Sequence, residues 1–371
     1  MAQLGRRIFY DRALSSSGRL SCADCHSPAH AYGPPGDLAV MAGGPALTRH
    51  GLRAVPSLMY LERQPPFSIG PDDPEAEGAA PAGSGTNLVP QGGLFWDGRA
   101  DTLQGQALGP LLNPLEMDGG SVATVARKLR RAAYAPLLVQ LFGGSVFARP
   151  DAAVAEALSA VARFEFEDPS FHPYTSKYDF WLEGKARLSA AEERGRRLFD
   201  DPHGANCAAC HLDRPSADGL PPMFTDHQYE ALGVPRNPAI PANHDPRYFD
   251  LGLCGPQRTD LRDQTRYCGM FATPTLRNVA TRSVFFHNGV YHTLADALDF
   301  YVRRDRDPAL RRFDDLPAAD RANVDTVDAP FGRLPGAAPV LTPAQERDVL
   351  AFLGTLTDGY RPNAVPPGGS P

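Results

Sequence analysis

Two short segments repeat a pattern of two cysteines followed directly by a histidine. They are Cys22-Ala23-Asp24-Cys25-His26 and Cys207-Ala208-Ala209-Cys210-His211. In such a C-x-x-C-H motif, the thiols can bond the two vinyl groups of one porphyrin and the histidine can bind its iron. A redox dithiol or a zinc site is the alternative, but zinc needs further Cys or His pairs at short spacing, and none is present. The sequence therefore predicts two covalent c-type haems, with His26 and His211 as iron ligands.

The two remaining cysteines, Cys254 and Cys268, bear on the cellular compartment. Bacterial c-type haem is attached outside the cytoplasm, and a disulfide suits such an oxidising environment. We therefore predict a disulfide between them, the alternative being two buried free thiols. Met1–Arg6 lacks the apolar segment of a signal peptide, so we expect a leader peptide to precede this sequence and the protein to be periplasmic.

The composition is that of an ordinary globular chain. Its 371 residues suggest roughly two domains, and 37 prolines with 35 glycines predict that much of the chain is ordered loop. The net charge of −6, without a cluster of Lys or Arg, gives no indication of nucleic-acid binding. No apolar run approaches the length that crosses a membrane, so we expect no membrane insertion.

The haem motifs follow two similar lead-in segments, Gly5–Asp11 and Gly195–Asp201. Both read Gly-Arg-Arg, then an aliphatic residue and a phenylalanine, Phe9 or Phe199. This similarity predicts an internal duplication in which a helix and a loop precede each motif. A capping-box pattern begins the second of these helices at Ser189.

Apolar spacing and capping signals predict further helices, and the fold class is mainly α, with two cytochrome-c-like haem domains and long ordered loops. The predicted helices are Val122–Phe142, Asp151–Phe166, Thr293–Arg304 and Pro343–Leu356, the last with Thr342 as its N-cap. The predicted loops are Gln64–Gly93 and Asp213–Gln264, and Glu167–Lys185 connects the domains 1–166 and 167–371. No strand is predicted.

Four other stretches carry a family resemblance. They are Phe95-Trp96-Asp97-Gly98-Arg99-Ala100, Asn113-Pro114-Leu115-Glu116-Met117, Thr273-Pro274-Thr275-Leu276-Arg277-Asn278 and Phe286-His287-Asn288-Gly289. With the two haem motifs in order, the chain resembles the bacterial dihaem cytochrome c peroxidase and MauG superfamily over nearly its whole length. The resemblance implies a peroxide-reactive haem in the first domain and an electron-transfer haem in the second.

The resemblance also implies the distal pocket of the first haem. Gln106, Pro110 and Glu116 follow Trp96 in the family's register. A carboxylate can take a proton from one peroxide oxygen and return it to the other, an amide can orient peroxide, and proline offers no competing donor. Glu116 as a solvated surface acid is the alternative. Trp96 is expected to relay electrons or holes between the haems, or to be a core tryptophan only.

The second haem separates two branches of the family. Cytochrome c peroxidases of the family carry a methionine at the end of the helix after the Phe-His motif, whereas MauG-like proteins carry a tyrosine. The register gives Tyr301, which shares a helical face with Leu294 and Leu298. A phenolate would hold the iron ferric. The alternatives are a plain buried tyrosine, with Met223 or Met270 as the ligand.

The chain departs from the family's pattern at a calcium site between the domains. The family's Asn ligand is absent from Arg53-Ala54-Val55-Pro56-Ser57. The remaining ligands would be the backbone carbonyls of Arg282 and Val284, so we expect a weakened calcium site. His30 or His50 could cap the first haem, but a surface or hydrogen-bonded histidine is commoner.

The leading functional hypothesis is a MauG-like oxidoreductase. Hydrogen peroxide would generate a high-valent dihaem state that oxidises a residue on a secreted or periplasmic partner protein. Asp250–Cys268 and Phe313–Pro317 are similar to the methanobactin-linked, MbnH-like enzymes, which convert a partner tryptophan to kynurenine. Ala205 stands where the MauG that matures methylamine dehydrogenase has a surface tryptophan, which argues against the same partner. The alternatives are a cytochrome c peroxidase fed by a small redox protein and an electron-transfer module without catalysis.

Overall fold

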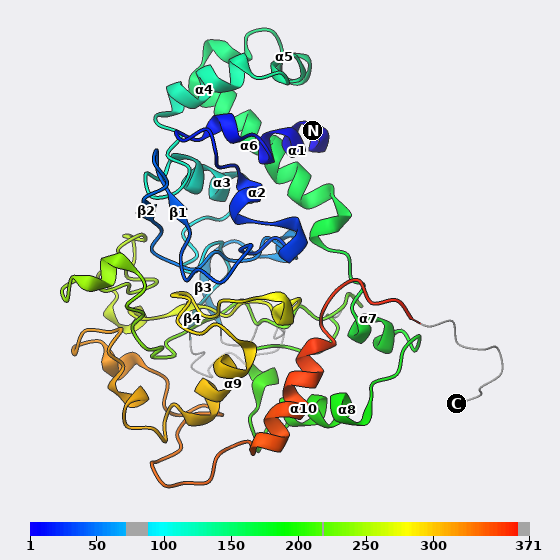
Figure 1. Ribbon diagram of the computed structural model, residues 1–371, viewed down its shortest axis with the longest axis vertical. Coiled ribbons are helices and arrows are strands. Elements are labelled where there is room, and N and C mark those ends of the chain that lie inside the picture. Colours follow the sequence, from blue (N-terminus) through cyan, green and yellow to red (C-terminus); the bar gives the residue numbers. More distant parts are fainter. Residues whose placement is uncertain (72–87, 217–218, 363–371) are drawn as a thin grey trace, which may run out of the picture.

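The computed structural model describes residues 1–71, 88–216 and 219–362. Helices dominate this part of the chain, which confirms the mainly α class. Figure 1 shows two lobes: we call the part around helices α1–α6 the first lobe and the part around α7–α10 the second lobe. No helix in the described ranges is both long and apolar enough to cross a membrane.

The first lobe packs its helices around α6. Its helices are α1 (Ala2–Phe9), α2 (Cys22–Cys25), α3 (Leu103–Leu112), α4 (Val122–Arg131), α5 (Ala135–Phe142) and α6 (Pro150–Glu167). Val154, Leu158 and Val161 recur at helical spacing on α6 and are buried. Their apolar face meets α1, α3 and α4, so burial of this face stabilises the lobe.

The second lobe has a smaller helical core. Its helices are α7 (Lys177–Leu182), α8 (Ala190–Asp200), α9 (Leu294–Arg303) and α10 (Pro343–Gly354). Phe199, Phe224 and Phe352 are almost completely buried and pack ring against ring. Eleven short 3₁₀ helices lie in the described ranges of both lobes: Arg12–Leu14, Pro28–His30, Leu61–Arg63, Val146–Ala148, Pro169–Phe171, Cys207–Ala209, Pro241–His244, Thr265–Tyr267, Val279–Thr281, Leu310–Arg312 and Arg321–Asn323.

The repeated lead-in segments form equivalent helix pairs. A Cβ atom on Gly5 would lie 1.8 Å from the carbonyl oxygen of Ala160, and one on Gly195 would lie 1.9 Å from that of Asp348. Helix α1 therefore crosses α6 at a glycine, as α8 crosses α10 (Figure 1). The phenylalanine four residues later is buried in each case. This close approach explains the repeated glycine.

The described residues form three small antiparallel sheets, so the expectation of no strands is wrong. β1 (Ala42–Gly43) pairs with β2 (Arg49–His50), β3 (Ser68–Pro71) with β4 (Leu88–Gln91), and β5 (Tyr229–Glu230) with β6 (Phe271–Ala272). Within the predicted loop Gln64–Gly93, β3 and β4 pair with Pro71 opposite Leu88, and residues 72–87 lie outside the described ranges. Strands of two to four residues are too short to show an alternating pattern.

The helix predictions hold with one correction. Val122–Phe142 is not one helix, because residues 132–134 separate α4 from α5. Pro136 lies in the first turn of α5, where its missing N–H costs nothing, whereas a continuous helix would have placed it in the interior. The other predicted helices are confirmed, as are the capping boxes of Ser189 and Thr342.

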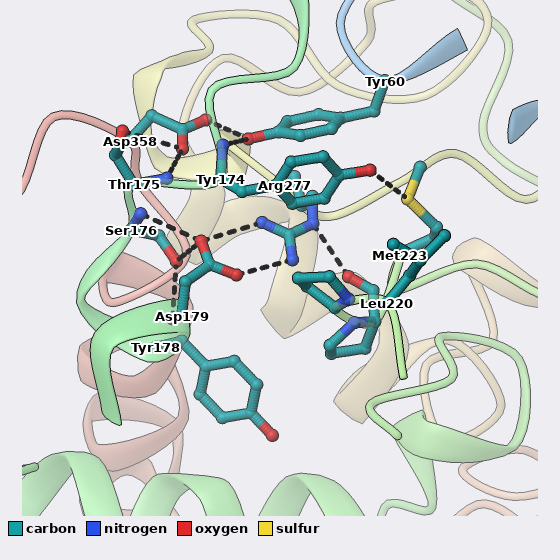
Figure 2. A network of polar contacts seen from close by, with 12 residues as sticks. Tyr60, Tyr174, Thr175, Ser176, Tyr178, Asp179, Leu220, Met223, Arg277 and Asp358 are labelled. Carbon is teal, nitrogen blue, oxygen red and sulfur yellow. Dashed lines mark hydrogen bonds and ion pairs between the residues drawn. The ribbon is translucent and has the colours of Figure 1, made fainter. Parts of the chain in front are cut away.

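A buried polar network joins the lobes through the connecting segment Glu167–Lys185 (Figure 2). The Arg277 guanidinium donates to both carboxylate oxygens of Asp179, at 3.1 and 2.8 Å. The Tyr60 hydroxyl of the first lobe donates to Asp358 of the second at 2.5 Å. The network thus connects Tyr60 of the first lobe to the second lobe, and the boundary at 166/167 stays a prediction.

Candidate active site

The first haem motif lies on a single helical turn. In α2, Ser21 and Asp24 form a capping box, so Cys22 and Cys25 project from an ordered turn. The Nδ1 atom of His26 lies 3.1 Å from the Tyr32 carbonyl oxygen. This contact assigns the proton to Nδ1 and leaves Nε2 to bind a metal. Burial lowers the pKa of His26 to about 4, so the imidazole is neutral.

The second motif repeats this arrangement on the 3₁₀ turn Cys207–Ala209. The Nδ1 atom of His211 lies 3.0 Å from the Phe224 carbonyl oxygen. Burial also lowers the pKa of His211 to about 4. Both histidines thus have the tautomer and charge that an iron ligand needs, which fits the predicted haems.

A cavity of about 330 Å³ reaches from the second motif to residues of the first lobe. Its lining is mostly apolar and includes Trp96, Gln106, Cys207, Cys210, His211 and Tyr301. An apolar space beside the two cysteines and the histidine fits a porphyrin. The predicted residues Cys22, Cys25, His26, Pro110 and Glu116 are not among those that line this cavity in the described ranges.

Helix α3 and the turn after it carry the predicted distal residues of the first haem. Gln106 and Pro110 lie one helical turn apart and share a face, and Gln106 is buried. Glu116 follows in the turn, where Asn113 donates its amide to the Oε1 atom at 2.6 Å. Burial raises the pKa of Glu116.

Glu116 lies near the first haem motif. Burial raises the pKa of the Cys25 thiol, and the charge of Glu116 adds to this effect. The spacing after Trp96 thus brings a carboxyl group within electrostatic reach of this motif, which supports its predicted role.

Gly43 is a positioning residue that the sequence analysis missed. The N–H of Gly44 donates to the Glu116 carbonyl at 2.8 Å, and a Cβ on Gly43 would lie 2.6 Å from the Cα of Glu116. Strand β1 thus supports the turn that holds Glu116. Nothing in the spacing signals this contact, because it joins segments more than 70 residues apart.

Trp96 lies where the lobes meet. Its Nε1 atom donates to the Ala54 carbonyl at 2.8 Å, and the N–H of Ala54 donates to the His287 carbonyl at 2.7 Å. We call the contact between segments 53–57 and 282–288 the seam. Arg53 reinforces the seam through ion pairs with Asp97 and Asp250.

Tyr301 lines the cavity close to the second motif. Burial raises the pKa of its phenol, and the charges of Cys210 and Cys207 act in the same direction. A phenolate at this place therefore needs a positive partner, which a ferric iron would supply.

The two alternative methionines have other surroundings. Met223 also lines the cavity, but its sulfur accepts a hydrogen bond from Tyr174 at 3.7 Å (Figure 2). Met270 packs against the cluster around Cys254 and Cys268, which form the predicted disulfide.

The two candidate capping histidines differ. His30 lines the cavity, and its Nδ1 atom lies 3.0 Å from the Ser27 hydroxyl. His50 is exposed on β2. Neither the contact of His30 nor the exposure of His50 identifies that histidine as a ligand of the first haem.

The residues expected to hold calcium do not fit that ion. The Nε atom of Arg282 donates to the Val284 carbonyl at 3.3 Å, and its Nη2 atom donates to the Val55 carbonyl at 3.0 Å. Ala54 offers no side-chain oxygen. Calcium needs six to eight oxygen ligands, and a guanidinium already occupies one of the two predicted carbonyls.

Comparisons with known proteins identify the family of the chain. Residues 1–187 match the family model of the di-haem cytochrome c peroxidases. The methylamine utilization protein MauG of Paracoccus denitrificans is 33% identical, covering 96% of this chain and 88% of the relative. The crystal structure of the dihaem peroxidase BthA from Burkholderia thailandensis is 39% identical with a TM-score of 0.84, covering 96% of this chain and 86% of that one. A MauG-like protein associated with microbial copper homeostasis is 26% identical with a TM-score of 0.61, covering 96% and 89%.

Proposed function

The chain belongs to the family of dihaem cytochrome c peroxidases and MauG proteins, which are peroxide-dependent oxidoreductases, and we propose that it uses hydrogen peroxide to oxidise a residue of a partner protein. The family's two c-type haems would be held by the two C-x-x-C-H motifs, with Cys22 and Cys25 bonded to one and Cys207 and Cys210 to the other. Bound haem would supply the redox chemistry, which is cleavage of the O–O bond and storage of two oxidising equivalents.

The observation that carries the proposal is the position of Tyr301. Its phenol lines the cavity beside Cys207 and Cys210, and helix α9 contains no methionine. As a phenolate on the second iron, Tyr301 would stabilise the ferric state. A ferric iron of low potential accepts an electron from a redox protein poorly. The enzyme would therefore meet peroxide with both irons ferric and recover two electrons from its partner.

The residues of the first lobe would handle peroxide and its proton. Glu116 would accept the proton of the near peroxide oxygen and return it to the far oxygen, while Asn113 holds its Oε1 atom. The Gln106 amide would orient peroxide by hydrogen bonding. Pro110 presents no N–H that could compete.

Trp96 would connect the two sites. The indole is buried and anchored to Ala54 at the seam, and it lines the cavity that extends to the second motif. Residues 1–166 would then form the peroxide-reactive domain and residues 167–371 the electron-transfer domain.

The proposed partner is a secreted or periplasmic protein, and conversion of a tryptophan to kynurenine is the proposed modification. Two turnovers with hydrogen peroxide would supply the four oxidising equivalents and two oxygen atoms that open the indole to N-formylkynurenine, with release of two waters, and hydrolysis would then remove the formyl group as formate. Likeness to MauG and to the copper-associated MauG-like protein supports a protein substrate. The Cys254–Cys268 disulfide supports a periplasmic location. Ala205 lies buried at the position of MauG's surface tryptophan, so the route to the partner would differ.

A dihaem peroxidase fed by a small redox protein is the second candidate. The observation that favours it is the 39% identity to a solved dihaem peroxidase, which exceeds the identity to the MauG relative. Both candidates share the residues of the first lobe. They differ in whether the second haem must first be reduced.

The deciding experiment mixes the diferric holoenzyme with hydrogen peroxide and follows its absorption spectrum by stopped flow. We expect reaction without prereduction. Tyr301→Met should abolish this reaction and restore it only after one-electron reduction. Tyr291→Phe is the matched control, because Tyr291 lies in the same aromatic cluster. The centroid of its ring lies 5.6 Å from that of the Phe286 ring. A wild-type enzyme that reacts only after prereduction would establish the peroxidase instead.

A second experiment tests the partner. Secreted tryptophan-bearing proteins encoded beside this gene are incubated with enzyme and peroxide, and mass spectrometry follows each tryptophan. Conversion to kynurenine supports the proposal. Sustained peroxide consumption with a reduced cytochrome, without any change in these proteins, supports the second candidate.

A further inference from the structure

Arg282 is a partly buried cation that lines the edge of the cavity and pairs with no carboxylate of the described chain. Buried arginines of this protein bind acids, as Arg277 binds Asp179. Within the described ranges, no ion pair to Arg282 is present, and its guanidinium donates to the backbone carbonyls of Val55 and Val284 instead. A charge that is partly removed from water needs other polar groups to replace its hydration, and here the backbone carbonyls do so.

The contacts of Arg282 cross the seam. Val284 belongs to the second lobe and Val55 to the first, so the guanidinium holds the two segments together. A Cβ on Gly33 would lie 3.2 Å from the Nη1 atom, which shows that the first lobe also closes over the charge. Carbonyl oxygens converging from two segments are the ligand type of a hard cation.

The same seam positions groups of the proposed active site. Val55 follows Ala54, which accepts the Trp96 hydrogen bond. Val55 precedes Pro56, whose backbone interacts with the His26 imidazole. The charge of Arg282 itself acts on His26. A cation at this point therefore holds the backbone beside the two residues that contact Trp96 and the first histidine.

We infer that the Arg282 guanidinium is an internal cation that takes the place of calcium at the seam, so that the lobes are held without a metal ion. The guanidinium donates to the Val284 carbonyl, one of the two oxygens expected to bind calcium, and to the Val55 carbonyl across the seam, while Ala54 supplies no side-chain oxygen. A divalent ion at this place would also be repelled by the fixed positive charge. The inference does not depend on which partner the enzyme oxidises.

The test measures calcium content by elemental analysis and thermal unfolding of the holoenzyme in chelator and in millimolar calcium. Wild type should contain no bound calcium after gel filtration, and its Tm should be the same in both buffers. Ala54→Asn should also contain no calcium and show the same Tm in both buffers, because the Arg282 guanidinium still occupies the site. Ala54→Asn with Arg282→Thr should bind one calcium ion and gain a calcium-dependent rise in Tm.

Arg282→Thr alone should lower the Tm in chelator by roughly 5 °C, because the seam loses its cation. Arg247→Gln is the control, since this arginine of the same lobe is 88% exposed. Stoichiometric calcium in wild type, or a Tm that falls in chelator, would overturn the inference. So would a folded double variant that remains free of calcium, which would show that this is no cation site.

Discussion

A carboxyl group partly buried near a haem motif differs from an exposed one in the pH at which it holds a proton. Glu116 has such a position: burial raises its pKa, the amide of Asn113 lowers it through one hydrogen bond, and the charge of Arg99 lowers it further. The carboxylate is the form that accepts a proton from peroxide. Acid-base catalysis by Glu116 should therefore weaken as the pH falls through this raised pKa.

Glu116→Gln should slow the reaction with hydrogen peroxide by about 10²–10⁴-fold while both haems stay attached. It should also remove the decline of the rate at acid pH. Stopped-flow rates from pH 5 to 8 measure both effects. Asp118→Asn is the control, because Asp118 lies two residues away but binds Ser16 and faces Arg49. An unchanged rate in Glu116→Gln would exclude this residue from proton transfer.

A second buried carboxyl group makes stability depend on pH. Burial raises the pKa of Glu165 to about 8, and its Oε2 atom has no hydrogen-bond partner among the described residues. The unfolded chain ionises this group near its ordinary value of 4.5. Between these pH values the folded state binds more protons than the unfolded state, so stability falls as the pH rises from about 4.5 to about 8.

Glu165→Gln should remove this loss, which is of the order of 5 kcal/mol above pH 8. Denaturant unfolding at pH 5.5 and 8.5 measures it. Wild type should be less stable at pH 8.5, and the variant should show a smaller difference. Glu167→Gln, at the end of the same helix and exposed, should leave the wild-type difference unchanged. Equal slopes in wild type and Glu165→Gln would contradict the prediction.

At the scale of elements, a glycine sets each helix crossing that supports a haem motif. Gly195→Ala would place a methyl group against the Asp348 carbonyl, where neither backbone can give way, so α8 and α10 must separate. We expect a loss of roughly 1–3 kcal/mol in the free energy of unfolding. Gly354→Ala in α10 is the control, because its Cβ meets nothing within 4 Å and alanine favours a helix. Equal stabilities of the two variants would contradict this account of the crossing.

Local signals predicted most of the helices, and long-range contacts explain what was missed. The capping boxes of α8 and α10 depend on residues three apart, which the sequence displays. Pro136 is a local signal against one helix over Val122–Phe142, because proline is tolerated only in the first turn of a helix. The strands β3 and β4 gain their pairing from each other across a long segment, which no local pattern encodes.

The candidate site divides in the same way. The C-x-x-C-H spacing indicated His26 and His211 because covalent chemistry requires adjacent residues. Gly43 and Arg282 act through tertiary contacts with a carbonyl or a backbone turn. No local sequence pattern marks these two positions, so only the structure identifies their roles.

At the scale of the whole molecule, the Tyr60 ring of the first lobe packs on Arg277, whose buried ion pair with Asp179 belongs to the second lobe. Asp179→Asn would leave the Arg277 guanidinium buried with weakened compensation (Figure 2). We expect a loss of about 3–5 kcal/mol, measured by denaturant unfolding. Asp348→Asn breaks a bidentate pair of similar geometry with Arg194, whose side chain is 59% exposed, and should cost at most about 1 kcal/mol. Similar losses in both variants would show that burial does not govern the Arg277 pair.

Communication between the lobes is the property on which the proposed function most depends, and Trp96 is the residue placed to provide it. The chain has two tryptophans. Trp96 lies at the seam and lines the cavity, whereas Trp181 lies on α7 and packs against Tyr178. An indole is easier to oxidise than a phenyl ring, so Trp96→Phe keeps a smaller aromatic ring at this place but should remove the relay.

Trp96→Phe should retain both haems and react with peroxide at a rate within about threefold of wild type, because Glu116 and Gln106 are unchanged. The second oxidising equivalent should no longer reach the second haem, and oxidation of the partner should be lost. Electron paramagnetic resonance of each haem after peroxide addition measures this directly. The variant also leaves the Ala54 carbonyl without its donor, which should cost roughly 1–3 kcal/mol of stability. Trp181→Phe should preserve partner oxidation. If Trp96→Phe still shares both equivalents between the haems, the route between the lobes bypasses the seam.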